Sequence, residues 1–279
     1  MKAGNLPLID RIIECALEED LGAGDITTSA TVDPSTKGEA RLLAKEEIIL
    51  AGIEIFSRVF YRLDPEIAVE YTYHDGDMVP SGREIGTVKG SMGGILSGER
   101  TALNFLQHLS GIATLTRLYV EKTNPAKVRI VDTRKTTPGL RVLEKYAVRI
   151  GGGFNHRFGL FDGILIKDNH IVAAGSISKA VEKISENAPH TLRIEVEVED
   201  VDGLEEAINA GADAVLLDNM SLGEMRNAVS IAGGRVILEA SGGVTLESIE
   251  EIAKTGVDMI SVGALTHSAR SVDISLEVI

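Results

Sequence analysis

The amino-acid sequence predicts an α/β protein whose larger part is an incomplete (β/α) barrel. Three observations support this fold class. Strands alternate with helices from residue 128 onward, only six such units are visible, and the first five predicted strands end in or just before a charged residue. A different pattern of antiparallel strands and helices precedes them and predicts a separate N-terminal domain.

The alternating part is recognised by its periodicity, since short apolar runs are followed by segments with apolar residues at helical spacing. The predicted strands cover 128–132, 163–168, 192–198, 214–218, 235–240 and 259–263. The predicted helices cover 139–150, 176–187, 202–212, 221–232 and 245–256. Ser221 with Glu224 forms a capping box, and Gly211, Gly233 and Gly256 stand where helices should end. This alternation is typical of βαβ units in a parallel sheet.

Six units are too few for a full eight-unit barrel, so an incomplete barrel and a doubly wound sheet are the candidates. The strand ends favour the barrel, because in a barrel every strand points its carboxyl end at one mouth. The charged strand-end residues are Asp132, Lys167, Glu197, Asp218 and Glu239.

The first 112 residues are predicted to form a domain of their own. Antiparallel strands are expected within 38–52, 67–90 and 93–100, with helices at the N-terminus and at 53–64. A long helical pattern from residue 98 to about 124, interrupted near Ser110-Gly111, leads into the barrel domain of residues 113–269. The alternating segment 270–279 is predicted to return to the first domain as a strand.

Composition limits the partners. The formal charge of −14 argues against nucleic-acid and anionic-membrane binding, and no run of about 18 apolar residues predicts a membrane span. One cysteine, Cys15, excludes internal disulfides and indicates a cytoplasmic location. Residues 127–170 nevertheless hold nine Lys and Arg against four acids, a net charge of +5 that leaves −19 elsewhere. This basic segment predicts a local anion site, with a chance cluster of surface charges as the competing interpretation.

The basic group at the strand ends is the strongest chemical signal. It comprises Arg134, Lys135, His156, Arg157 and Lys167, with the hydroxyl of Thr133 beside it. Guanidinium groups bind carboxylate or phosphate in a bidentate manner, while lysine acts as a point charge. Such groups at one barrel mouth repel each other unless an anion balances them, so they predict an anionic ligand. Surface salt bridges are the alternative.

Two carboxylates and two glycine-rich turns complete the candidate site. Glu197 and Asp218 lie on the same predicted rim, where they could hold Mg²⁺ or stabilise a developing cation at a sugar carbon. Buried acids neutralised by basic neighbours are the alternative. Backbone N–H groups of Ser241, Gly242, Gly243 and Gly263, after the last two strands, are suited to a phosphate.

Several motifs resemble those of the quinolinate phosphoribosyltransferase family, also called nicotinate-nucleotide pyrophosphorylase (carboxylating). They are "GERTALNFLQHLSGIATLT" (98–116), "DTRKTTPGLRVLEKYAVRIGGGFNHRFGLFDGILIKDNHI" (132–171), "EVEV" (195–198), "LLDN" (216–219) and "EASGGVT" (239–245). The resemblance runs from residue 18 to the last strand. It implies an N-terminal α/β sandwich joined to an incomplete α/β barrel, working as a homodimer in the cytoplasm.

The resemblance also implies an activity and a set of roles. The expected enzyme is a pentosyltransferase that condenses quinolinate with phosphoribosyl pyrophosphate (PRPP), giving nicotinate mononucleotide, pyrophosphate and CO₂ for NAD biosynthesis, with Mg²⁺. The quinolinate carboxylates would be held by Arg134, His156, Arg157 and Lys167, with Arg100 reaching into the partner subunit's site. Thr133 and Lys135 would also contact substrate. Glu197 and Asp218 would serve ribose and metal, directly or through water, and the catalytic set would be Lys135, Glu197 and Asp218. Ser241, Gly242, Gly243 and Gly263 would bind the 5′-phosphate.

Two other functions compete with this one. A related phosphoribosyltransferase could act on another aromatic acid, although a single carboxylate would need fewer cationic ligands. A barrel lyase could instead form a Schiff base through Lys135 or Lys167. That function would leave the glycine turns and the Glu197 and Asp218 pair without a purpose.

Overall fold

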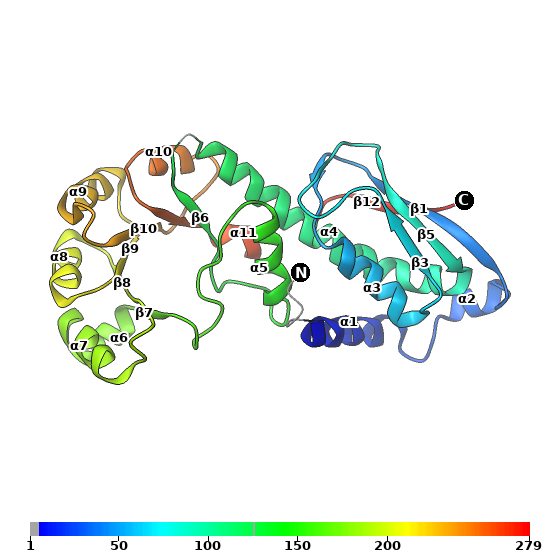
Figure 1. The fold of residues 1–279 in the computed structure, drawn as a ribbon, viewed down its shortest axis with the longest axis horizontal. Helices are drawn as coiled ribbons and strands as arrows, with labels where there is room; N and C mark the ends of the chain where they lie inside the picture. Colours follow the sequence, from blue (N-terminus) through cyan, green and yellow to red (C-terminus); the bar gives the residue numbers. More distant parts are fainter. Residues whose placement is uncertain (1–5, 125) are drawn as a thin grey trace. The chain divides into compact units, whose positions relative to one another are not determined.

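The computed structural model describes residues 6–124 and 126–279, which divide into two compact units. Unit 1 comprises Met1–Arg117, Thr136–Gly152 and Ser268–Ile279, and unit 2 comprises Leu118–Lys135 and Gly153–His267. The predicted first domain starts at residue 1, and its residues 1–5 lie outside the described part. The two units are coloured along the chain in Figure 1 and are described separately below.

Unit 1 contains a four-stranded antiparallel sheet in the order β12-β1-β5-β3. Its strands are β1 (Lys37–Ala44), β3 (Ala68–Tyr71), β5 (Glu84–Ser91) and β12 (Ile274–Val278), and a small sheet pairs β2 (Ile48–Ile49) with β4 (Met78–Val79). The helices are α1 (Leu6–Leu21), α2 (Ile26–Thr31), α3 (Ile53–Leu63), α5 (Arg141–Ile150) and most of α4 (Met92–Lys122). The C-terminal strand β12 therefore pairs with β1, as the alternation of its sequence suggests.

Apolar side chains at helical spacing hold α1 against α3. Ile9 and Ile13 of α1 and Phe56 and Phe60 of α3 are all fully buried, and the two phenylalanine rings meet edge to face. Burying side chains of this size stabilises a fold by about 1.5–3 kcal/mol each. The Arg58–Asp10 ion pair joins the two helices at their border.

One predicted strand is wrong. Residues 93–100 belong to helix α4, which runs without a break through Ser110 and Gly111. The glycines that suggested strands and a break are packing positions. A Cβ on Gly98 would lie 2.8 Å from a Leu63 methyl carbon, and one on Gly111 would lie 2.1 Å from the Arg270 carbonyl oxygen. Close approach of neighbouring segments, and not flexibility, explains glycine at these points. No described helix has the length and apolar character needed to cross a bilayer.

Unit 2 is built on a six-stranded parallel sheet. Its strands are β6 (Arg129–Val131), β7 (Ile164–Ile166), β8 (Ile194–Val198), β9 (Ala214–Asp218), β10 (Ile237–Ser241) and β11 (Met259–Ser261). The helices of this unit are α6 (Asp168–Ala174), α7 (Ile177–Asn187), α8 (Val201–Ala210), α9 (Leu222–Ala232), α10 (Ile249–Ala253) and α11 (Ala264–His267). Figure 1 shows α7, α8 and α9 along the outer side of the strands.

The strand order decides between the two predicted architectures. The order β6-β11-β10-β9-β8-β7 follows the chain from β7 to β11 and then returns to β6, so it has no switch point of the doubly wound kind. No ladder joins β6 to β7 among the described residues, so the barrel is open there. The incomplete barrel predicted from the sequence is confirmed.

Local signals fix most helix ends in unit 2. Ser221 and Glu224 form the predicted capping box of α9, and Gly211 and Gly233 end their helices with positive φ angles. Helix α10 ends earlier than predicted, at Ala253, three residues before Gly256.

Candidate active site

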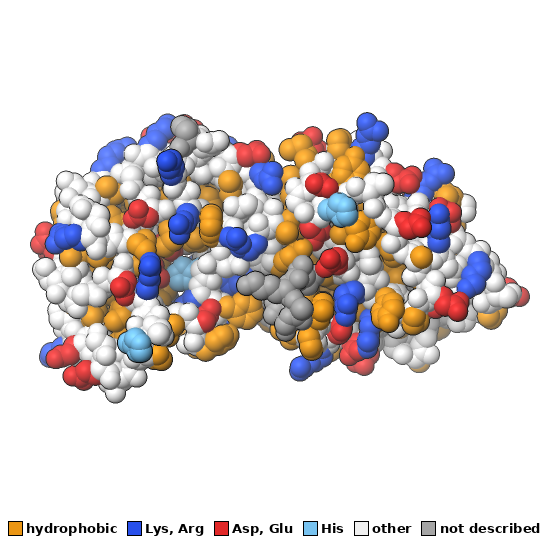
Figure 2. Space-filling model, viewed as in Figure 1, with side chains coloured by type: hydrophobic (Ala, Val, Ile, Leu, Met, Phe, Trp, Pro, Cys, Tyr) orange, Lys and Arg blue, Asp and Glu red, His pale blue; other side chains and the backbone are white. Residues whose placement is uncertain are grey.

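Two of the predicted arginines lie close enough in unit 2 to influence each other. Arg134 follows β6 and is exposed, whereas Arg157 is partly buried. Burial lowers the pKa of the Arg157 guanidinium, and the positive charge of Arg134 lowers it further. An arginine remains charged under these conditions, so the two cations form a concentrated positive region. Figure 2 shows Lys and Arg side chains around a hollow in this unit, with a histidine inside it.

Lys135 lies beside the segment that follows β11, the last strand of unit 2. Its backbone N–H donates to the Thr133 hydroxyl at 3.1 Å, and its carbonyl oxygen accepts a 2.8 Å hydrogen bond from Thr266. A Cβ on Gly263 would lie 3.3 Å from the Lys135 side chain. The structure thus brings a predicted catalytic lysine together with a predicted phosphate-binding glycine.

Lys167 and Glu197 form an ion pair between the ends of two neighbouring strands. The pair joins the residue after β7 to β8, and both side chains are partly exposed. The backbone N–H of Lys167 donates to His170 Nδ1 at 2.9 Å, so His170 caps the start of α6. His170 therefore has a local structural role here.

The two predicted rim carboxylates share one face of the sheet. Glu197 is paired in register with Leu216, and Asp218 lies two positions further along β9 on the same face. Asp218 is paired in register with Ser241 of β10, which opens the glycine turn. The carboxylates therefore adjoin the predicted phosphate site.

Asn219 holds Asp218 and the glycine turn together. Its side-chain amide donates to Asp218 Oδ2 at 2.9 Å, and its backbone N–H donates to the Ser241 carbonyl at 2.9 Å. Among the described residues it is the one non-glycine with positive φ, at 56°. A Cβ on Gly242 would lie 2.1 Å from Asn219 Oδ1, so only glycine fits beside this asparagine.

His156 lies deeper than the other predicted ligands. Its side chain is 15% exposed, and Nε2 lies 2.9 Å from Glu195 Oε2. Its backbone N–H donates at 2.9 Å to Asp132, a fully buried carboxylate that also accepts from the Asn155 amide at 2.6 Å. Asp132, expected at the mouth, thus lies inside the unit and anchors this segment.

Glu239 is the other correction among the strand-end residues. It lies in the middle of β10 and is fully buried, so it does not face the mouth. Neither of its carboxylate oxygens has a hydrogen-bond partner at normal distance among the described residues. Burial raises the pKa of Glu239 to about 7, with repulsion from Glu195 as the next cause.

Sequence reasoning missed three residues of this region as part of the site: Glu195, Glu239 and Asn219. The two-residue period was a usable signal for Glu195, because it places this side chain on the face of Glu197. Glu239 was noted as a strand end only. Asn219 lacks such a signal, since its backbone conformation depends on the neighbouring strand.

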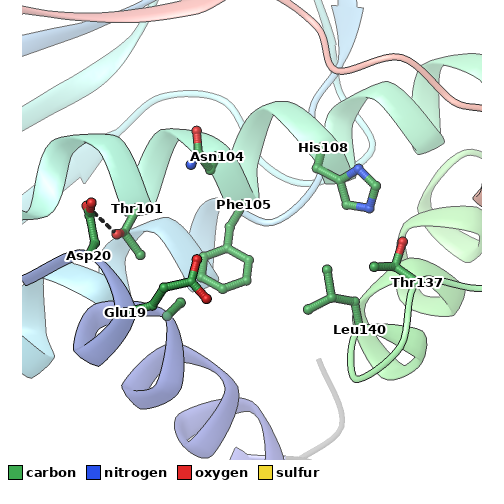
Figure 3. A pocket seen from close by; sticks show the side chains of 9 residues that line it. Glu19, Asp20, Thr101, Asn104, Phe105, His108, Thr137 and Leu140 are labelled. Carbon is green, nitrogen blue, oxygen red and sulfur yellow. Dashed lines mark hydrogen bonds between the residues drawn. The ribbon is translucent and has the colours of Figure 1, made fainter.

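A separate pocket lies in unit 1, with a volume of about 370 Å³. Figure 3 shows its wall, with Glu19 and Asp20 from α1 facing Thr101 and His108 of α4, and Asp20 accepts a 3.1 Å hydrogen bond from Thr101. Two carboxylates and no Lys or Arg make it unsuitable for an anionic substrate. Arg100 precedes Thr101 on α4 and is exposed. Arg100 belongs to unit 1, whereas the other predicted ligands belong to unit 2.

Comparisons with known proteins identify relatives over almost the whole chain. Residues 25–110 match the family model of the quinolinate phosphoribosyl transferase N-terminal domain, and residues 112–277 match that of the C-terminal domain. A Bacillus subtilis protein described as a probable nicotinate-nucleotide pyrophosphorylase (carboxylating) is 49% identical over 260 residues, which cover 93% of this chain and 90% of that protein. A chloroplastic nicotinate-nucleotide pyrophosphorylase (carboxylating) of Arabidopsis thaliana is 43% identical over 96% of this chain and 82% of its own length.

Solved structures agree. The structure of NadC from Streptococcus pyogenes superposes with a TM-score of 0.95 at 43% identity, covering 99% of this chain and 98% of that one. The nicotinate-nucleotide pyrophosphorylase from Francisella tularensis gives a TM-score of 0.94 at 46% identity, covering 98% and 96%. Domain models, sequence relatives and structures all agree with the motifs and the site geometry, and the chain belongs to the quinolinate phosphoribosyltransferase family.

Proposed function

We propose that this protein transfers the phosphoribosyl group of PRPP to quinolinate with loss of CO₂, giving nicotinate mononucleotide and pyrophosphate. Membership of the family and the names of its relatives support this activity. The observation that carries it is the gathering of cationic side chains and two carboxylates at one end of the parallel sheet of unit 2. The reaction class is pentosyl transfer in NAD biosynthesis.

The cations suit a substrate with two carboxylates. Arg134 and Arg157 repel each other. Lys167 adds a third positive charge, and Glu197 balances that charge but not those of the two arginines. A dianion such as quinolinate relieves this repulsion and can bind a guanidinium in bidentate fashion. Lys135, held near Gly263, is placed to contact the phosphoribosyl side as well.

The phosphate group of PRPP is assigned to the turns that follow β10 and β11. Gly242 and Gly243 both have positive φ angles, which leave backbone N–H groups available on a turn without side chains. Gly263 follows β11 at the neighbouring strand end. Phosphate sites after the last two strands are common in α/β barrels.

Glu197 and Asp218 would hold Mg²⁺. Their donor set fits the ion, because Mg²⁺ prefers carboxylate oxygens together with water, and both groups are only partly buried. When bound, the ion would neutralise the charge of the pyrophosphate leaving group. Asn219 keeps Asp218 oriented by its hydrogen bond, while Glu197 is shared with Lys167.

This reaction requires the protein to position the two substrates and to stabilise developing charge; it does not require a nucleophilic side chain. As pyrophosphate departs, the ribose carbon gains positive character, which the fixed carboxylates of Glu197 and Asp218 stabilise. The quinolinate nitrogen then attacks this carbon and becomes a pyridinium nitrogen. When the neighbouring carboxylate leaves as CO₂, its electron pair stays on the ring carbon beside that positive nitrogen, and a proton taken up from water completes the product. The protein's further task is to keep water from that carboxylate.

Assembly and location belong to the same proposal. We infer a homodimer in which Arg100 serves the partner's site, which agrees with its exposure on α4. The cytoplasmic location expected from the single cysteine stays a prediction.

The test is to incubate the purified protein with quinolinate, PRPP and Mg²⁺ and to measure CO₂ and nicotinate mononucleotide together. Equal amounts of both are expected, with none when PRPP is omitted and a strong decrease when EDTA removes the metal. Nicotinate in place of quinolinate is the matched control, since it lacks the second carboxylate. Product from nicotinate but not from quinolinate would refute the assignment.

A further inference from the structure

No strand ladder joins β6 to β7 within the described residues, and the segment 153–163, which lies between α5 and β7, pairs with the free edge of β6. Phe154 pairs with β6, because its N–H donates to the Ile130 carbonyl at 2.8 Å and its carbonyl accepts from Asp132 at 3.1 Å. On the other side, Arg157 reaches the Gly163 carbonyl, just before β7, at 3.1 Å. This segment therefore runs from the edge of β6, where its backbone is bonded, to the start of β7, where the Arg157 side chain fixes it.

Two buried carboxylates, one next to β6 and one on the distant strand β8, form hydrogen bonds with His156 of this segment. Asp132, at the end of β6, accepts from the backbone N–H of His156 at 2.9 Å. Glu195, on β8, lies 2.9 Å from the His156 ring. Because β8 is four strands away from β6 in the sheet, His156 connects the two sides of the opening across the interior.

The hydrogen bonds of the His156 ring define its tautomer. The backbone N–H of Arg157 points at Nδ1 from 2.8 Å, so Nδ1 is an acceptor and carries no proton. The proton of the neutral ring is then on Nε2 and is donated to Glu195. Loss of the Glu195 acceptor would release Nε2, so the ring could turn away and the Arg157 N–H would lose a fixed partner.

We propose that Glu195 is a positioning residue of the quinolinate site, which fixes the His156 ring and, through Nδ1, the main chain that carries the Arg157 guanidinium. This inference rests on the proposed function for the identity of the ligand. In this proposal His156 acts indirectly, because both of its ring nitrogens form hydrogen bonds within the protein. Arg157 is the residue that contacts the substrate.

The same three side chains also meet the spacing of a metal site. Ligand atoms of His156, Glu195 and Glu239 all lie within 4.8 Å of one another. The 2.9 Å contact between Nε2 and Glu195 has the length of a hydrogen bond, and Glu239 lies further away, at 3.8 Å. The geometry therefore favours a proton between His156 and Glu195, and metal analysis belongs in the test.

The test compares Glu195→Ala and Glu195→Gln with Glu239→Gln as the matched control. Glutamine at 195 keeps the volume and an acceptor oxygen, whereas alanine removes the acceptor. Glu239→Gln alters a buried acid in the same cluster that makes no short contact to His156. Isothermal titration with quinolinate alone should show binding weakened about tenfold in Glu195→Ala, and changed less than about threefold in the other two variants.

Nitrogen-15 NMR of the histidine rings, with His156→Gln to assign the signal, supplies a second readout. The wild type should show His156 with the proton on Nε2, and Glu195→Ala should lose this preference together with the hydrogen-bonded shift of the Arg157 amide. Four outcomes would overturn the proposal: a proton on Nδ1 in the wild type, unchanged quinolinate binding in folded Glu195→Ala, equal weakening by Glu239→Gln, or one equivalent of divalent metal that the variants lose. If the wild type binds no quinolinate, the proposed function fails, and the NMR result alone decides whether Glu195 positions His156.

Discussion

Replacing Glu239 by glutamine should stabilise the protein at neutral and alkaline pH, and this effect should fade as the pH falls toward 4.5. The carboxyl group is fully buried, faces Glu195, and has no hydrogen-bond partner at normal distance within the described part of the chain. A buried charge of this kind is costly, and the cost appears only when the group loses its proton. Glutamine has nearly the same shape and cannot ionise.

The magnitude follows from the pKa. Burial and Glu195 raise the pKa of Glu239 from 4.5 to about 7 in the folded protein. At about 1.4 kcal/mol for each pH unit, this difference corresponds to about 3 kcal/mol. The folded state binds more protons than the unfolded state between these two values, so wild-type stability falls as pH rises from about 4.5 to 7. Below 4.5 both states are protonated and the penalty is absent.

The assay is urea unfolding of wild type and Glu239→Gln at half-unit steps from pH 4.5 to 8.5, followed by circular dichroism. The difference in free energy of unfolding should grow from about 0.8 kcal/mol at pH 5 to about 3 kcal/mol at pH 8. Glu199→Gln, at an exposed position just after β8, controls for the loss of one negative charge. A constant difference across the pH range, or a variant less stable than wild type at pH 8, would refute the claim that ionisation of buried Glu239 destabilises the folded protein.

Three further predictions concern the site. Arg134→Ala should weaken quinolinate binding at least about tenfold without changing the unfolding midpoint, because the side chain is exposed; normal affinity by titration calorimetry would contradict its assignment. Gly242→Ala should raise the KM for PRPP more than that for quinolinate, because the added Cβ would collide with Asn219, and an equal rise in both would argue against a phosphate role for this turn. Mixed Arg100→Ala and Lys167→Ala subunits should regain about a quarter of wild-type activity, as expected if a hybrid dimer has one intact site and half of the dimers are hybrids. No recovery after subunit exchange is confirmed by mass spectrometry would exclude a role for Arg100 across an interface.

The repeating part of the fold could be predicted from the sequence because its signals are local. Apolar alternation, capping boxes and terminal glycines placed all six strands of unit 2, and β9 has the predicted bounds. The error at residues 93–100 has a physical cause. Glycines in α4 were interpreted as strand or loop signals, whereas they are needed for contact with residues such as Leu63 that are distant in the sequence. One sequence does not reveal such contacts.

The candidate site, too, could be predicted from the sequence only in part. Charged residues after strands were visible in the sequence, and the structure brings Lys167 to Glu197 and places Asp218 in register with Ser241. The interior acids were not assigned, because the pattern of a strand does not tell whether an inward carboxylate lies at the mouth or below it. That depth depends on the register between strands, which is a property of the folded sheet.

The short edge strands of unit 2 bear on how the protein behaves at high concentration. Unpaired strand edges recruit other chains and promote aggregation, and the risk grows with their length. Here β6 and β7 have three residues each, and the backbone of Phe154 already occupies the outer edge of β6. The short edges, one of them occupied by Phe154, therefore offer little backbone to a second chain, and the open barrel is expected to resist self-association through its strands.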